Sequence, residues 1–133
     1  MSLIKIINLP PLGDERGSLV SLESNRNIPF EIKRAYYIFN TKYGVSRGFH
    51  AHRNIKQITI CVSGSCRFIL DDGYIREEVY LDNPSKGLLI EDLIWREMHD
   101  FSSDCVLLVL TNEYFNEKDY IRNYKEFIRI VNQ

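Results

Sequence analysis

Two of the three histidines in the chain, His50 and His52, stand two residues apart in the stretch 47–52. Side chains alternate between the two faces of a β-strand, so a strand here would point both imidazoles the same way, with Arg47 close by. The imidazole pKa, roughly 6.5, lets histidine take or give a proton near neutral pH. This pair predicts either a proton-transfer site or half of a metal site, and two histidines on an exposed edge strand are the plainer alternative.

The totals of the chain describe an ordinary globular protein. Its 133 residues suit one domain, 1–133, with 44% hydrophobic and 26% charged residues. The net charge of −1 offers no attraction for nucleic acid or an anionic membrane, and no apolar run approaches the roughly 20 residues of a membrane helix. Three cysteines in apolar surroundings predict reduced, buried thiols and a cytoplasmic location, with a zinc site as the weaker alternative.

Short strands separated by turn residues account for most of the chain. The expected strands cover residues 3–9, 18–23, 32–39, 48–52, 57–62, 66–70, 74–81, 88–90, 94–99 and 105–110. The clearest hairpin is centred on Asp72-Gly73, because glycine supplies the positive φ of a tight turn. Apolar residues then recur at helical spacing over 120–131, and Asn116 is the expected N-cap. The pattern predicts an all-β sandwich or barrel with a C-terminal helix, and a jelly roll would point His50 and His52 into a ligand cavity.

The spacing around the histidine pair resembles the first signature of the cupin superfamily, whose fold is a double-stranded jelly roll. The residues that carry it are Gly44, His50, His52, Gln57 and Gly64. Metal-binding cupins usually have a glutamate ligand at the place of Gln57 and a histidine at that of Met98. An amide carbonyl and a thioether are poor substitutes for those ligands, and on a strand His99 would face away from Met98. We therefore expect a cupin frame that binds no metal and no other cofactor.

Without a metal, two clustered imidazoles suit general acid–base catalysis. One ring can remove a proton from a carbon next to a carbonyl, while the other carries a proton to or from oxygen. The enolate charge that develops needs a nearby cation or hydroxyl donor. Arg47 is the first candidate, followed by Arg34 and Tyr36 or Tyr37 on the preceding strand and Arg67 on a following one. Each has a plainer alternative, because strand tyrosines usually pack and arginines usually lie at the surface.

A set of short motifs makes the resemblance closer than superfamily level. They are Asp-Glu-Arg-Gly-Ser-Leu (14–19), Ile-Lys-Arg-Ala-Tyr-Tyr-Ile-Phe (32–39), Arg-Gly-Phe-His-Ala-His (47–52), Gly-Ser-Cys-Arg (64–67), Leu-Asp-Asp-Gly (70–73), Met-His-Asp-Phe-Ser-Ser-Asp-Cys (98–105) and Asp-Tyr-Ile-Arg-Asn-Tyr (119–124). Together they resemble the sugar-nucleotide 3,4-ketoisomerases, the small metal-free cupins of the WxcM-like, FdtA-type family. The matches run over nearly the whole chain and are specific as a set.

The resemblance implies a substrate, dTDP-4-dehydro-6-deoxy-D-glucose, and a reaction that moves its ketone from C4 to C3 through an enediol, for later transamination to a deoxyamino sugar. It implies His50 as the base at carbon and His52 as the proton shuttle at oxygen, although the two roles could be exchanged. Arg47 and Tyr36 would bind or polarise the sugar or its diphosphate. Arg67 would suit the diphosphate, because a guanidinium matches phosphate oxygens in a fork.

The configuration at C4 and the oligomeric state also rest on the resemblance. Arg16 resembles the residue of members that form galacto products, whereas Arg96 resembles that of gluco-forming members, so the product stays open. Both arginines are candidate substrate-binding residues. Family members form homodimers that exchange N-terminal strands, and the apolar strand 3–9 would serve such an exchange.

Three other functions remain open at this point. A 3,5-epimerase acting on the same nucleotide sugar would use similar proton abstraction but would leave the ketone at C4. A non-catalytic cupin module would bind the nucleotide sugar and leave it unchanged. A metal-dependent, dioxygenase-type cupin would need ligands that Gln57 and Met98 do not supply.

Overall fold

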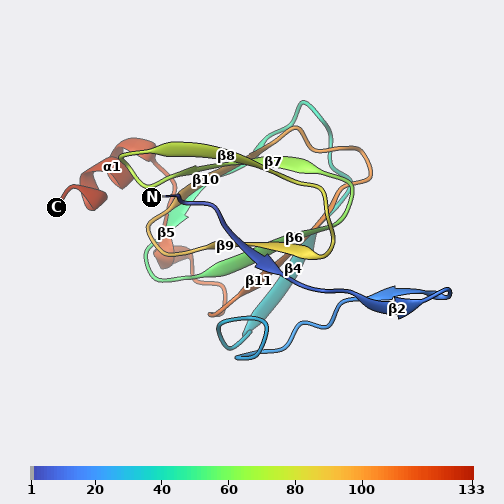
Figure 1. Cartoon of the computed structure of the whole chain (residues 1–133). Coiled ribbons are helices and arrows are strands. Elements are labelled where there is room, and N and C mark those ends of the chain that lie inside the picture. Colours follow the sequence, from blue (N-terminus) through green and yellow to red (C-terminus); the bar gives the residue numbers. More distant parts are fainter. Residues whose placement is uncertain (1) are drawn as a thin grey trace.

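Two five-stranded antiparallel sheets, packed face to face, make up the body of the protein (Figure 1). The structure is a computed structural model that describes residues 2–133. The first sheet has the strand order β1-β9-β6-β11-β4, and the second has the order β12-β5-β10-β7-β8. The strands are Lys5–Asn8 (β1), Leu12–Asp14 (β2), Gly17–Leu19 (β3), Arg34–Ile38 (β4), Arg47–His52 (β5), Gln57–Ser63 (β6), Cys66–Asp71 (β7), Arg76–Leu81 (β8), Lys86–Ile90 (β9), Trp95–His99 (β10), Val106–Thr111 (β11) and Tyr120–Ile121 (β12). The predicted all-β jelly roll is confirmed.

Every strand range predicted from the sequence overlaps an observed strand. The hairpin predicted around Asp72-Gly73 joins β7 to β8, and Gly73 has the positive φ, 95°, that the turn requires. The predicted strand 18–23 is shorter than expected, because its pairing with β2 ends at Leu19. Strands β2 and β12 are too short to carry an alternating pattern, so the sequence showed neither.

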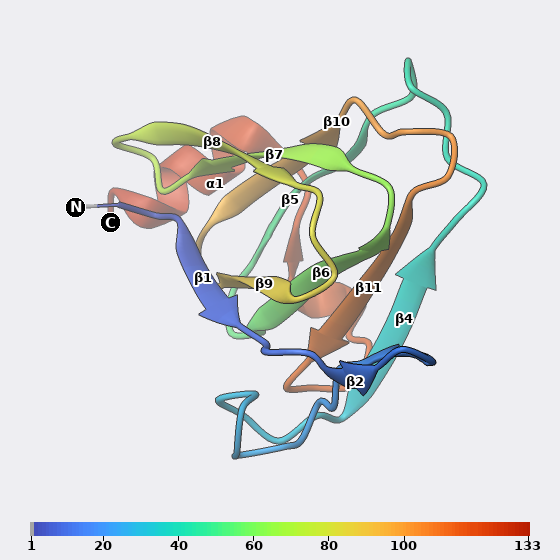
Figure 2. The same ribbon diagram turned by 45° about the vertical axis from the view of Figure 1, so that its right-hand side comes forward.

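The main core lies between the two sheets. Figure 2 shows the two sheets from a second direction. Its fully buried side chains include Phe68 and Leu70 from the second sheet and Leu88 and Leu107 from the first. A second apolar cluster covers the other face of the first sheet, where Ile58 packs with residues of the N-terminal segment. Both faces of β6 are therefore buried, although its sequence alternates.

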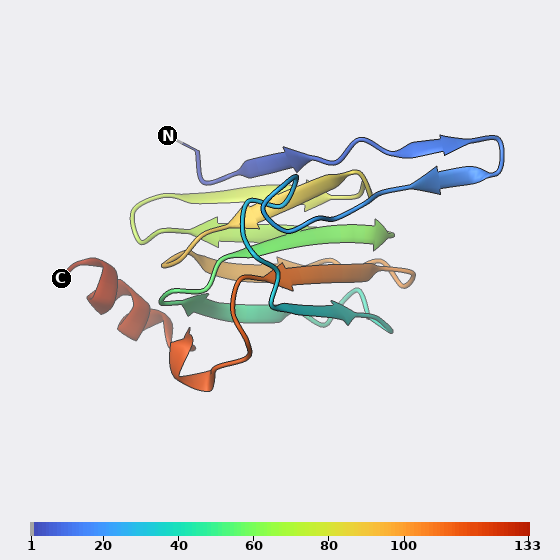
Figure 3. The ribbon, with the colours of Figure 1, turned by 90° about the horizontal axis from the view of Figure 1, so that it is seen from below.

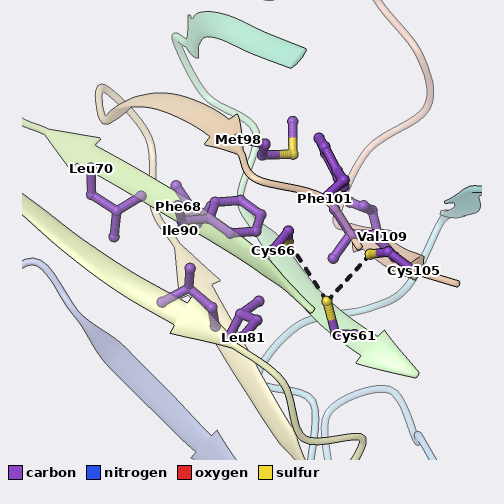
Figure 4. Close-up of a cluster of buried hydrophobic side chains, with 12 residues drawn as sticks. Cys61, Cys66, Phe68, Leu70, Leu81, Ile90, Met98, Phe101, Cys105 and Val109 are labelled. Carbon is purple, nitrogen blue, oxygen red and sulfur yellow. Dashed lines mark hydrogen bonds between the residues drawn. The ribbon is translucent and has the colours of Figure 1, made fainter. Parts of the chain in front are cut away.

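Three buried thiols pack together in the main core (Figure 4). The Sγ atom of Cys61 lies 3.6 Å from that of Cys66 and 3.7 Å from that of Cys105. The hydrogen bond with Cys66 and burial raise the pKa of the Cys61 thiol, and burial raises the pKa of Cys105 to about 12. Because metals bind the thiolate form, this cluster favours packing over zinc binding. The prediction of reduced, buried cysteines is confirmed.

The C-terminal segment differs from the single helix predicted over 120–131. Asn116 caps a short 3-10 helix, Glu117–Asp119 (η1), and not the α-helix. Tyr120–Ile121 pair with β5 as strand β12, and helix α1 runs only over Tyr124–Val131, with Asn123 as its N-cap. The pairing with β5 is a tertiary contact, so apolar spacing alone could not reveal it. None of the helices in the described part of the chain is long and apolar enough to cross a membrane.

The β2–β3 hairpin projects from the body at the end opposite helix α1 (Figure 3). It forms a separate two-stranded sheet. Its residues Leu12 and Leu19 are 65% and 59% exposed, which is unusual for large apolar side chains brought together on one hairpin. Strand β1, in contrast, pairs with β9 of the same chain.

Candidate active site

A cavity of about 670 Å³ is lined by residues of both sheets and of the C-terminal segment. The charged and aromatic lining residues discussed here come from β4, from β5 and from the segment that begins with β12. They are Arg34, Tyr36, Arg47, His50, Tyr120 and Arg122. Four of the residues proposed from the sequence therefore meet in one place.

Strand β5 holds the two histidines on one face, as its alternation predicted. The rings of His50 and His52 lie edge to face, with centroids 5.0 Å apart and planes at 86°. His50 lines the cavity, whereas His52 is 1% exposed and does not. The first ring can therefore touch a bound molecule, and the second is placed to act on or through the first.

A bulge in β5 brings Arg47 to the same cavity as His50. They are three positions apart, so a regular strand would place their side chains on opposite faces. Gly48 and Phe49 both have positive φ, 90° and 58°, and the register with β10 shifts at this point. Glycine is needed because a Cβ at Gly48 would lie 3.1 Å from the carbonyl oxygen of Arg96. The expected proximity of Arg47 thus depends on a feature that simple alternation would not produce.

Asp119 orients the His52 ring. Its Oδ2 lies 3.1 Å from His52 Nδ1, and its Oδ1 accepts a hydrogen bond from the backbone N–H of Asn54 at 2.9 Å. A carboxylate accepts from the ring, so Nδ1 carries the proton and Nε2 has the free lone pair. Within residues 2–133, His52 Nε2 and His50 Nδ1 are buried without a hydrogen-bond partner. No protein group among the described residues engages either nitrogen, so both keep their capacity for proton transfer.

A buried arginine, Arg96, adds a positive charge close to the two histidines. Arg96 is 1% exposed, and it donates to the side-chain oxygen of Gln57 at 2.6 Å and to the carbonyl oxygen of Ile94 at 2.8 Å. In the described chain no carboxylate forms an ion pair with it. Burial lowers the pKa of Arg96 to about 10, so it remains charged at neutral pH.

Both imidazoles are neutral at physiological pH. Burial, together with the nearby Arg96 charge, lowers the pKa of His50 to about 3 and that of His52 to about 2. A neutral imidazole is the form that accepts a proton, so each ring is held ready to act as a base. The same arginine can stabilise negative charge that develops on a bound molecule.

Arginines and aromatic rings surround the two histidines. The Tyr120 ring centroid lies 4.4 Å from that of His52 and 5.0 Å from that of His50. The Arg122 guanidinium lies 4.1 Å above the Tyr120 ring, and that of Arg34 lies 4.3 Å above the Tyr36 ring. Burial raises the pKa of Tyr36, so its hydroxyl stays protonated. Together with Arg47, these guanidinium groups make the cavity suited to an anionic ligand.

Two predicted site residues lie away from this cavity. Arg67 pairs with Asp100 at 2.8 Å and with Glu78 at 2.6 Å. Arg16 lies on the projecting hairpin, 85% exposed and paired with Asp14. Neither lines the cavity of its own chain, and the buried Arg96 does not line it either, so the predicted roles of all three arginines in substrate binding stay predictions.

Asp119, Tyr120 and Arg122 are functional candidates that residue-by-residue reasoning missed. The motif at 119–124 did contain them. Helical spacing predicted that this motif belongs to the C-terminal helix. In the structure its residues Tyr120 and Ile121 form β12, which pairs with the histidine strand β5. The available signal was the motif itself, which combines an acid, two tyrosines and an arginine within six residues.

The comparisons with known proteins agree with this geometry. Residues 2–132 match the family described as FdtA: WxcM-like, C-terminal. The chain is 54% identical over 127 residues to a TDP-4-oxo-6-deoxy-alpha-D-glucose-3,4-oxoisomerase of Aneurinibacillus thermoaerophilus, covering 96% of this chain and 91% of the relative. A crystal structure of a 3,4-ketoisomerase from Helicobacter canadensis is similar, with 47% identity, a TM-score of 0.95 and 98% of each chain covered.

A third similar protein was crystallised with a ligand. It is a histidine-to-asparagine mutant of a 3,4-ketoisomerase from Thermoanaerobacterium thermosaccharolyticum, in complex with TDP-4-keto-6-deoxyglucose. Its identity to this chain is 40%, its TM-score is 0.95, and 98% of this chain and 95% of that chain are covered. With a family match over nearly its full length and a relative 54% identical, this chain belongs to the FdtA family of WxcM-like proteins.

Proposed function

We propose that this protein is a sugar-nucleotide 3,4-ketoisomerase that acts on dTDP-4-dehydro-6-deoxy-D-glucose. It moves the ketone from C4 to C3 and yields a dTDP-3-dehydro-6-deoxyhexose of galacto or gluco configuration. The observation that carries this function is a neutral imidazole, His50, in the wall of a cavity lined by arginines, with the Asp119-oriented His52 ring against it. Moving a ketone by one carbon needs a base at carbon and a proton carrier at oxygen, and this pair supplies both.

His50 is the base that removes the proton from C3, because its ring lines the cavity. The electrons of that C–H bond form the enediol as the C4 oxygen gains a proton. The C3 hydroxyl then loses its proton to give the new ketone, and C4 gains a proton on carbon. His52, held by Asp119 with its ring against that of His50, relays the oxygen protons through the His50 ring. The positive charge of buried Arg96 stabilises the negative charge that develops on the C4 oxygen as the C3 proton is removed.

The nucleotide diphosphate is bound by the guanidinium groups at the cavity. Arg34, Arg47 and Arg122 all line it, and each can offer paired N–H donors to phosphate oxygens. Tyr36 adds a protonated hydroxyl that can contact the sugar. Arg67 is a weaker candidate for the diphosphate, because two carboxylates already hold its guanidinium.

The reaction proceeds without a metal. The place of a cupin metal ligand is taken by Gln57, whose side-chain oxygen accepts a hydrogen bond from Arg96 at 2.6 Å. A guanidinium so close would repel a metal cation from that oxygen. Met98 lines the cavity with a thioether, which is a poor ligand for hard divalent ions.

The active form is a homodimer that exchanges N-terminal segments, and the enzyme is cytoplasmic. The support for exchange is the β2–β3 hairpin, which pairs with no other strand of residues 2–133 and exposes Leu12 and Leu19. In the single chain β1 pairs with β9, so the hairpin is the segment free to cover a second copy. Arg16 on that hairpin would then reach a partner's surface. The three free cysteines support a reducing compartment.

The test is proton NMR of dTDP-4-dehydro-6-deoxy-D-glucose incubated with the protein in deuterated water. We expect the 4-ketone signals to disappear and a 3-keto product to form that carries deuterium at C4, with its configuration read from the spectrum. Deuterium at C3 and C5 with the ketone still at C4 would instead identify an epimerase. Unchanged substrate, with binding seen by calorimetry, would identify a non-catalytic module.

A matched pair of variants separates the base from the fold. His50→Asn keeps a polar side chain of similar width and should abolish turnover while substrate still binds. Tyr80→Ala removes an exposed side chain of β8, far from the cavity lining, and should leave turnover unchanged. Full activity in His50→Asn would contradict the assignment of the base.

A further inference from the structure

The third histidine of the chain, His99, lies on the face of β10 that points away from the core, where the acid–base chemistry does not use it. Its side chain is 18% exposed, while its neighbour Met98 is buried and lines the cavity. The prediction that the two side chains face opposite ways is thus confirmed. His99 nevertheless contacts Ser46, just before β5, and Phe49 within β5, on the two sides of Arg47.

Both ring nitrogens of His99 are occupied. Nε2 lies 2.9 Å from Oε1 of Glu97, and Nδ1 lies 2.6 Å from Oγ of Ser46. The carboxylate can only accept, so Nε2 carries the proton and Nδ1 accepts the hydroxyl proton of Ser46. Glu97 is itself held, because its Oε2 accepts from the Trp95 indole N–H at 3.0 Å. The orientation of the imidazole is therefore determined from both ends.

The same ring also packs against a residue of β5. Phe49 packs edge to face with His99, at a centroid distance of 5.6 Å and an angle of 86°. Phe49 is 42% exposed and has a φ of 58°, which is uncommon for a bulky residue. A strained, half-exposed phenylalanine needs an external contact to stay in place, and His99 supplies one.

Ser46 and Phe49 bracket Arg47 and Gly48, which form the start of the bulge. That bulge is what brings Arg47 into the cavity beside His50. Besides the pairing of β5 with β10, the bulge is flanked by a side-chain hydrogen bond before it and an aromatic contact after it, and both lead to His99.

We propose that His99 is a positioning residue that holds Arg47 in the substrate cavity through Ser46 and Phe49. It touches no substrate and moves no proton in the reaction. This inference rests on the proposed function, because it assigns the consequence of losing His99 to nucleotide-sugar binding by Arg47. It predicts that affinity depends on a side chain on the opposite side of the sheet.

The experiment is a double-mutant cycle on the intact protein, with the dissociation constant for TDP measured by calorimetry and KM and kcat measured for the nucleotide sugar. His99→Ala should raise both the dissociation constant and KM by about three- to tenfold, the effect of about one hydrogen bond, with kcat within about twofold. In an Arg47→Ala background the same change should add less than about twofold, because sites that act through one another are not additive.

Graded variants give the control. His99→Asn keeps an acceptor near the place of Nδ1 and should recover part of the affinity, and Ser46→Ala should reproduce part of the loss. Tyr80→Ala removes an exposed aromatic ring two strands away and should change nothing. Thermal unfolding of each variant shows whether it is folded at the assay temperature.

Additive effects of His99→Ala and Arg47→Ala would overturn the proposal, as would an Arg47→Ala variant that binds TDP like the wild type. Loss of kcat with unchanged KM in His99→Ala would overturn it too, because positioning of a binding residue cannot produce that result. Failure of the proposed function would give a different experimental result. The wild-type protein would then not turn over the nucleotide sugar, and the TDP-binding cycle would still decide the role of His99.

Discussion

The Asp119→Asn substitution tests whether the tautomer of His52 matters for turnover. The carboxylate now accepts from His52 Nδ1 at 3.1 Å and from the backbone N–H of Asn54 at 2.9 Å. An amide can keep the second bond through its oxygen while its N–H₂ group faces the ring. Nδ1 must then accept, and the ring proton moves to Nε2, which loses its free lone pair.

The size of the effect follows from the bond that is lost. A hydrogen bond to a charged group contributes about 1.5–3 kcal/mol, and about 1.36 kcal/mol corresponds to a tenfold change in rate. We therefore expect kcat to fall by roughly 10- to 150-fold. KM should change little, because Asp119 does not line the cavity. The fold should persist, because the bond to Asn54 is retained.

The assay is steady-state turnover of the nucleotide sugar, together with nitrogen-15 NMR of the histidine rings in the free enzyme. The spectra should show the His52 proton on Nδ1 in the wild type and on Nε2 in the variant. A variant with the wild-type kcat would refute the role of Asp119. So would a lower kcat without a change of tautomer, because the loss would then have another cause.

Three further predictions concern buried side chains. The pKa values of His50 and His52 are about 3 and 2 in the fold, below the ordinary 6.5, so kcat/KM should stay level as the pH falls from 7.5 to about 5.5. Below pH 6.5 only the unfolded chain binds protons at these two residues, so chemical denaturation should show a free energy of unfolding that declines as the pH falls. Arg96→Met should lower kcat at least about tenfold by removing the buried charge. The melting temperature should change little, because removing a buried cation offsets the loss of its hydrogen bonds to Gln57 and Ile94; a variant with wild-type kcat would show that this charge is not used. Phe127→Ala should cost about 3–5 kcal/mol by emptying the fully buried space under helix α1; urea unfolding measures it, and a loss under about 1 kcal/mol would mean that the helix does not depend on this contact.

The sequence by itself determined the strands and the chemistry of β5. Period-two alternation and the Asp72-Gly73 turn depend on local rules, so the strand ranges and the β7–β8 hairpin could be predicted from neighbouring residues alone. Placing His50 and His52 on one face needed only the pleat of a strand. The motifs were specific enough to indicate the family and the reaction before any contact was known.

Only the tertiary structure decided which distant residues complete the site. Asp119 lies 67 positions from the histidine that it orients, and it arrives there because β12 pairs with β5, which no local spacing encodes. The bulge at Gly48 reverses the side that Arg47 faces, and it is visible only as positive φ and a shifted register. The lowered pKa values of the histidines likewise come from burial and from Arg96 on another strand. The sequence and local rules determine which side chains are present and which face of a strand they occupy. Packing decides which of them meet and in what state of charge.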